Sequence, residues 1–151
     1  MRIELSCRLP QRPQWVWERV RRSETLEFIT APLMKFEPTS GRFPSVWTAG
    51  NYEAQMRLFG VIPIGKQTIG IEYPEGEAGW IVRDNGHGQL IKRWDHWIFI
   101  EPEGEVARYT DRVDVSAGWL TPFVGLFARF FYAHRQRRWR ELAARDNQAF
   151  D

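Results

Sequence analysis

Three polar side chains, His96, Tyr109 and Asp111, are the best candidates for chemistry in this sequence. Residues 91–100 and 106–115 alternate between apolar and polar side chains with the period of two that indicates β-strands. All three candidates fall on the more apolar face of their segment, which should point into the core. Burial lowers the pKa of a histidine, and a neighbouring carboxylate raises it. Such a pair can work as a general acid and base, with Tyr109 as a hydrogen-bond donor, or anchor a polar group of a ligand.

The register of the expected hairpin decides how this pair meets. A turn centred on Glu103 and Gly104 would place His96 directly opposite Asp111. The flanking cross-strand pairs would then be Ile98 with Tyr109 and Trp94 with Val113. The alternative is that His96 and Asp111 only satisfy each other's hydrogen bonds in a packed core, or at its solvated rim.

A long helix is expected after these strands. Thr121 suits the N-cap and Pro122 the first helical position, and the helical pattern continues to about Arg145. Its first half carries an apolar arc of about 160° or more, which exceeds what one sheet face should need. This surplus predicts that the first helices cover the extra flank, or that it lines a cavity or a dimer contact, with ordinary core packing as the alternative. The arc comprises Phe123, Val124, Leu126, Phe127, Phe130, Phe131, Ala133 and His134.

The second half of the same helix is rich in arginine, above all between Arg135 and Arg140. At helical spacing these charges point in several directions, and arginines near a helix C-terminus complement the helix dipole. A solvated helix end is therefore the favoured interpretation of the cluster. The alternative is a protein- or membrane-surface interaction module that contacts anionic lipid or phosphate through this end.

The other segments place these candidates in an α+β fold. The expected order is a strand, a helical region and then strands in series, at 3–9, 13–29, 33–37, 51–59, 67–73 and 77–84. Residues 63–65 indicate a turn or bulge, and the Asn-Gly pair within 84–88 indicates a tight turn. Because the strands occur in runs rather than alternating with helices, we expect an antiparallel sheet with the long helix across one face.

Bulk composition excludes several classes of function. The chain has 151 residues and is expected to form one domain over 1–151, since 43% hydrophobic and 26% charged residues argue against disorder. Eight Trp and ten Phe predict an aromatic interior or an aromatic-lined site. A net charge of +2 does not favour a nucleic-acid partner. The sequence has no run of apolar residues resembling a signal peptide or a membrane span, so a cytoplasmic location is expected.

Sequence motifs point to neither a metal nor a cofactor. Cys7 is the only cysteine, so neither an intramolecular disulfide nor a multi-cysteine metal site can form. The three histidines lack the His-Glu-x-x-His spacing of zinc enzymes. Glycine-rich phosphate-binding motifs are also missing from the sequence. We therefore expect no metal and no cofactor.

The order of elements resembles the START-like, or SRPBCC, helix-grip superfamily over nearly the whole chain. Local features agree, namely the Ser116-Ala117-Gly118 stretch before the helix and the His134 to Leu142 segment near its end. The resemblance implies a curved antiparallel sheet of about seven strands that grips the C-terminal helix, with a cavity between them. In that superfamily the cavity usually holds a lipid, sterol, polyketide or other hydrophobic molecule.

The leading hypothesis is a binding or carrier protein for a hydrophobic small molecule, such as a lipid, an isoprenoid or an aromatic polyketide-like compound. The residues expected to contact it are Tyr52, Met56, Trp94, His96, Ile98, Tyr109, Phe123, Phe127, Phe130 and His134. The alternative is a polyketide cyclase- or dehydratase-like enzyme that uses the His96–Asp111 pair. A homodimer is compatible with the sequence.

Overall fold

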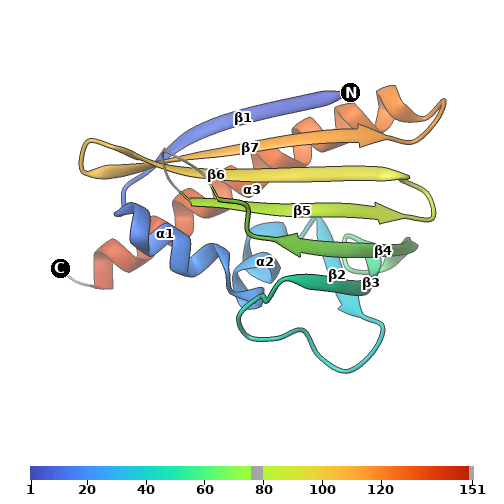
Figure 1. Cartoon of the computed structure of the whole chain (residues 1–151), viewed down its shortest axis with the longest axis horizontal. Helices are drawn as coiled ribbons and strands as arrows, with labels where there is room; N and C mark the ends of the chain where they lie inside the picture. Colours follow the sequence, from blue (N-terminus) through green and yellow to red (C-terminus); the bar gives the residue numbers. More distant parts are fainter. Residues whose placement is uncertain (76–79, 150–151) are drawn as a thin grey trace.

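The alternating segments form an antiparallel sheet of seven strands in the computed structural model, which describes residues 1–75 and 80–149 (Figure 1). The strand order is β1-β7-β6-β5-β4-β3-β2, so the first strand pairs with the last and the others pair with their neighbours in sequence. The α+β prediction is confirmed. The strands are β1 (Arg2–Leu9), β2 (Met34–Pro38), β3 (Gly50–Leu58), β4 (Ile62–Glu72), β5 (Trp80–Gly88), β6 (Arg93–Glu103) and β7 (Val106–Ser116).

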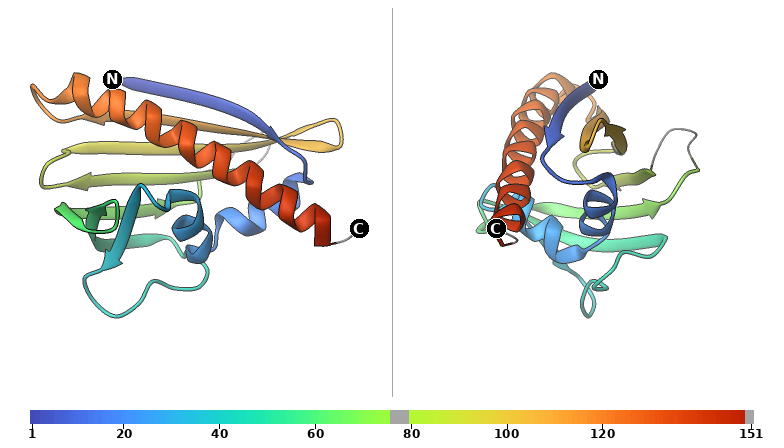
Figure 2. Two further views of the ribbon diagram at one scale, coloured as in Figure 1. Left: turned by 180° about the vertical axis from the view of Figure 1, so that it is seen from behind. Right: turned by 90° about the vertical axis from the view of Figure 1, so that its left-hand side faces the viewer.

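The described residues also form three helices, α1 (Pro13–Val20), α2 (Ser23–Thr30) and α3 (Thr121–Ala149). Figure 2 shows α3 running obliquely across the concave side of the sheet, with α2 packed against it. At 29 residues α3 is longer than predicted and spans roughly 43 Å. The Thr121 hydroxyl accepts from the Ala117 N–H and donates to the Gly118 carbonyl, which fixes the turn that leads into the helix.

The β6–β7 hairpin turns at Gly104 and Glu105, one residue later than the predicted centre at Glu103 and Gly104, and the φ of +64° at Gly104 favours glycine. His96 consequently lies opposite Val113, and Asp111 lies opposite Ile98. The prediction that His96 and Asp111 are direct cross-strand partners is therefore wrong by two residues. Because side chains alternate with a period of two, this shift leaves every side chain on its predicted face.

The tight turn predicted around the Asn-Gly pair is also wrong, because both residues lie inside strand β5. A Cβ at Gly86 would lie 2.9 Å from a main-chain oxygen of β6, so this glycine permits close approach of two strands. Strand β5 thus continues past Asp84, which pairs with His96 on the face toward α3. The start of the strand predicted at 77–84 lies outside the described residues. The bulge predicted at 63–65 is confirmed by the register shift between β3 and β4.

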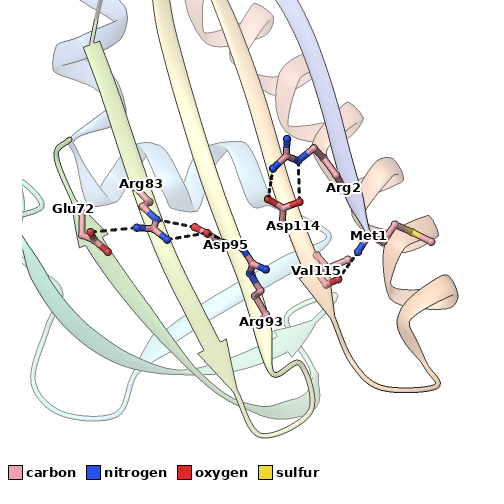
Figure 3. A network of polar contacts seen from close by, with 8 residues as sticks. All are labelled: Met1, Arg2, Glu72, Arg83, Arg93, Asp95, Asp114 and Val115. Atoms are coloured by element: carbon pink, nitrogen blue, oxygen red, sulfur yellow. Dashed lines mark hydrogen bonds and ion pairs between the residues drawn. The ribbon is translucent and has the colours of Figure 1, made fainter. Parts of the chain in front are cut away.

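The sheet face that points away from α3 carries charged and aromatic side chains. Arg83 donates two hydrogen bonds of 2.9 Å to Asp95 and stacks over the Trp97 ring at 4.8 Å. Arg2 forms a similar two-bond pair with Asp114, at 3.0 and 3.1 Å (Figure 3). These pairs connect β5 to β6 and β1 to β7 on the outside of the sheet. The inside is left for the apolar side chains and for the few polar groups described next.

Candidate ligand-binding cavity

The concave sheet face and helix α3 enclose a cavity of about 320 Å³. This volume lies at the small end of the roughly 300–1,000 Å³ that is typical of small-molecule sites. Leu90 and Phe123 both line the cavity and are 51% and 68% exposed, so it opens beside the first turn of α3. Its walls are mainly apolar and include Met34, Met56, Ile69, Ile71, Val82, Ile98, Phe127 and Phe131.

Most of the residues predicted to contact a ligand border this cavity. The sheet contributes side chains from β3 and β6, and the helix contributes the phenylalanines nearest its start. Alternation along the strands brings the sheet residues to one face, as the sequence pattern predicted. The predicted residues that line the cavity are Met56, Trp94, His96, Ile98, Phe123 and Phe127.

Four predicted residues lie elsewhere. Tyr52 bonds to Thr48 and packs on the Trp47 ring without lining the cavity, and Tyr109 is fully enclosed in the core. Phe130 is 58% exposed on the outer side of α3. His134 is buried, with its Nε2 2.8 Å from a main-chain oxygen of the α2–β2 connection. Helical spacing determines the angles between these side chains, but packing decides which side of the arc faces the sheet.

His96 and Asp111 meet despite the shifted register. The His96 Nε2 atom lies 2.7 Å from Asp111 Oδ1, reached diagonally across the two strands. The Tyr109 hydroxyl donates to the same oxygen at 3.0 Å, and Gln136 donates to Oδ2 at 3.1 Å. Three donors therefore surround a carboxylate that is only 1% exposed. Because the Tyr109 hydroxyl donates its hydrogen bond to Asp111, it is not available as a donor to a substrate.

The protonation states of the pair follow from this arrangement. Burial lowers the pKa of His96 by more than the neighbouring Asp111 raises it. Burial alone would raise the pKa of Asp111, but the hydrogen bonds from His96 and Gln136 and the charge of Arg135 lower it below its usual value. At neutral pH the site therefore holds a neutral imidazole that donates from Nε2 to a carboxylate. The other ring nitrogen, Nδ1, makes no hydrogen bond with any residue that the structure describes.

Asp84 places a carboxyl group at the cavity wall, at a position that the sequence pattern assigned to the end of one strand and the start of a turn. Its Oδ1 accepts a hydrogen bond of 2.8 Å from the Gly70 N–H. Burial raises the pKa of Asp84 to about 7, and Arg135 counteracts only part of this rise. The side chain borders the cavity rather than bulk water, and it is therefore largely neutral in mildly acidic solution.

Arg135 is the third polar group of the cavity, and the prediction that it belongs to a solvated helix end is wrong. Its side chain lines the cavity and only 6% of the residue is exposed. The guanidinium lies 5.1 Å from the ring centre of Tyr132 and 5.9 Å from that of Phe131. Its Nε atom has no hydrogen-bond partner among the described residues. A buried arginine facing an apolar cavity is the least expected feature of this site.

The remaining arginines of the predicted Arg135–Arg140 cluster do not form one surface. Arg138 donates to the Phe28 carbonyl at 3.1 Å and to Glu141 at 2.7 Å. Arg137 and Arg140 are exposed, as expected for a solvated helix end. The residues described by the structure contain no group of three His, Cys, Asp or Glu side chains placed to hold a metal ion.

A family model described as a domain of unknown function, DUF8410, matches residues 7–143. The chain belongs to this family. No match to this DUF8410 chain was found among the curated proteins. Within the described ranges, none of its helices combines the length and apolar character needed to cross a membrane.

Solved structures share the fold of the DUF8410 chain at low sequence identity. A START superfamily protein from Mycobacterium smegmatis is 10% identical with a TM-score of 0.69, covering 95% of this chain and 97% of that one. The AHSA1 protein from Silicibacter pomeroyi is 12% identical with a TM-score of 0.65, covering 97% and 99%. A Thermus thermophilus protein gives 12% identity, a TM-score of 0.67 and the same coverage of 97% and 99%. The START-like helix-grip fold is therefore confirmed.

Proposed function

We propose that this DUF8410 protein binds a hydrophobic small molecule between its sheet and helix α3, as a carrier or sequestering protein. The observation that supports this proposal is the cavity of about 320 Å³, with apolar walls and a small set of polar groups. That composition is typical of sites that hold a mainly apolar ligand and orient it through a few directed polar contacts. The helix-grip fold, which typically binds hydrophobic ligands, agrees with it.

The direct test is native mass spectrometry of freshly purified protein, followed by identification of any small molecule that is released on denaturation. A cavity-filling variant, Ile98→Trp, should lose that molecule because Ile98 lines the cavity and is 6% exposed. The matched control is Phe99→Trp, which changes the next residue on the opposite face of β6. Equal retention by both variants, with both folded, would show that the ligand does not occupy this cavity.

A second candidate is an enzyme of the cyclase or dehydratase type, favoured by the His96–Asp111 pair. His96 borders the cavity, and Asp111 holds its ring in the tautomer that leaves Nδ1 unprotonated. This nitrogen could accept a proton from a substrate held against β6. The lowered pKa makes it a weak base, so positioning would have to supply much of the effect.

His96→Gln separates the two candidates, since a glutamine amide can still donate to Asp111. An enzyme should lose turnover of a poly-β-ketone thioester while it retains affinity for that compound. A carrier should show no turnover before or after the change, and its affinity should alter little. Turnover that survives His96→Gln would exclude this histidine as the catalytic base.

A further inference from the structure

The cavity contains a positive charge that forms no ion pair with any residue that the structure describes. Arg135 is 6% exposed, and no carboxylate oxygen of the described residues lies within 4.0 Å of its guanidinium nitrogens. Its Nε atom is fully enclosed and has no hydrogen-bond partner in the part of the chain that the structure describes. Contacts with the Phe131 and Tyr132 rings compensate only part of the loss of water, because an isolated buried charge costs several kcal/mol. The neutral Tyr109 hydroxyl is a hydrogen-bond partner of Arg135, so within the described residues the guanidinium has no negatively charged acceptor bonded to it.

Neither carboxyl group of the cavity region supplies that acceptor. Asp111 already receives hydrogen bonds from His96, Tyr109 and Gln136, which occupy both of its oxygens. Asp84 accepts from the main chain of β4, and burial raises its pKa to about 7. The nearby Tyr109 and Asp111 oxygens raise the pKa of Arg135 against the effect of burial, so the guanidinium is charged at every relevant pH.

We propose that the ligand is an amphipathic carboxylic acid whose carboxylate binds Arg135 inside the cavity and whose apolar part extends toward the mouth. This inference rests on the proposed binding function and names the class of ligand for it. A carboxylate matches the planar guanidinium and can accept two parallel hydrogen bonds from it. The apolar wall between Arg135 and the mouth suits a hydrocarbon or aromatic tail.

The position of Arg135 along the helix determines the orientation of the acid. Phe123 marks the mouth, and Arg135 lies twelve residues further along α3, roughly 18 Å deeper at 1.5 Å per residue. The head group therefore enters first, and the tail remains nearest to solvent. One arginine with Asp84 and Asp111 in its surroundings suits a single negative charge better than the double charge of a phosphate monoester.

The test compares dodecanoic acid, dodecan-1-ol and dodecyl phosphate, which share a tail and differ in the head group. Trp94 and Trp139 line the cavity, so tryptophan fluorescence reports binding, with calorimetry as a second readout. Because the carboxylate would accept charge-assisted hydrogen bonds from Arg135, we expect the unmodified protein to bind the acid roughly tenfold to hundredfold more tightly than the alcohol. Arg135→Gln should abolish this preference, because the affinity for the acid should fall to about that for the alcohol. The control, Arg137→Gln, removes an exposed arginine from the same helix and should retain the preference.

Each outcome decides one of the two proposals. Equal affinity for acid and alcohol in the unmodified protein would overturn the carboxylate inference and leave hydrophobic binding intact. A preference that persists in folded Arg135→Gln would also overturn it, as would tighter binding of dodecyl phosphate. Binding of none of the three compounds would count against the proposed function itself. The comparison of head groups uses the unmodified protein, so it holds even if the variant does not fold.

Discussion

The raised pKa of Asp84 makes a sharp prediction about stability. The substitution Asp84→Asn replaces a half-buried ionisable group at the cavity wall with a neutral amide of the same shape. The amide oxygen can still accept the 2.8 Å hydrogen bond from the Gly70 N–H. Packing and this hydrogen bond are thus preserved, and the change isolates the cost of placing a negative charge at the cavity wall.

The magnitude follows from the pKa of Asp84, which burial raises from 3.8 to about 7. Roughly three pKa units at 1.36 kcal/mol each correspond to about 4 kcal/mol, an upper limit because the side chain borders the cavity. The folded chain keeps the proton to about pH 7, whereas the unfolded chain releases it near 3.8. The free energy of unfolding of the unmodified protein should therefore fall as pH rises through this window and level off above it.

Urea unfolding followed by tryptophan fluorescence at pH 4 to 8 measures this effect as a difference between the two proteins. At pH 8 the Asp84→Asn variant should be more stable, by up to about 4 kcal/mol, and the difference should shrink toward zero near pH 4. Asp95→Asn is the control of opposite sign, because hydrogen bonds and charge from Arg83 hold the pKa of Asp95 below its usual value despite burial. If Asp84→Asn is less stable than the unmodified protein at pH 8, Asp84 is ionised and paired in the folded chain, and the reasoning fails.

Three further predictions concern other parts of the fold. Gly86→Ala should lower the free energy of unfolding by about 1–3 kcal/mol, since its Cβ would lie 2.9 Å from the Trp94 main-chain oxygen; an unchanged urea midpoint would contradict this. Burial raises the pKa of Cys7 from 9.0 to about 11, so iodoacetamide at pH 8 should alkylate it roughly a hundredfold more slowly than an ordinary thiol, as measured by mass spectrometry. Gln136→Leu removes a donor to Asp111 and should cost about 1–3 kcal/mol at pH 7, measured by urea unfolding, with a smaller loss once acid protonates Asp111.

The sequence predicted the meeting of His96 and Asp111 better than it predicted the register. Alternation identified the inward faces of 91–100 and 106–115, and that property depends only on the period of a strand. The exact pairing depends on the turn, which lies at Gly104 and Glu105 rather than at Glu103 and Gly104 as predicted. A shift of two residues left both side chains inward and within 2.7 Å of each other. The alternation of side chains therefore predicts the inward face correctly even when the position of the turn, and with it the strand register, is misjudged.

Asp84 shows the opposite case, in which a local signal was misleading. An Asn-Gly pair commonly forms a tight turn, because both residues tolerate a positive φ. Here the glycine is needed for a different reason, the close approach of β5 to β6, which only the assembled sheet reveals. Asp84 consequently lies on the cavity wall, next to its cross-strand partner His96, rather than in a solvated turn.

By itself, the sequence determined the order of elements, the strand faces and the existence of a long C-terminal helix, because each follows from local periodicity and end signals. Only the tertiary structure decided which side of that helix faces the sheet. The choice exposes Phe130 and buries Arg135 in the cavity, against the expectation from their residue types. The reason is that helical spacing defines relative angles, whereas the rotation of the helix is set by the summed packing of its whole length against the sheet. Arg135, the polar group that best indicates a ligand, was therefore recognisable only from the packing of the helix against the sheet.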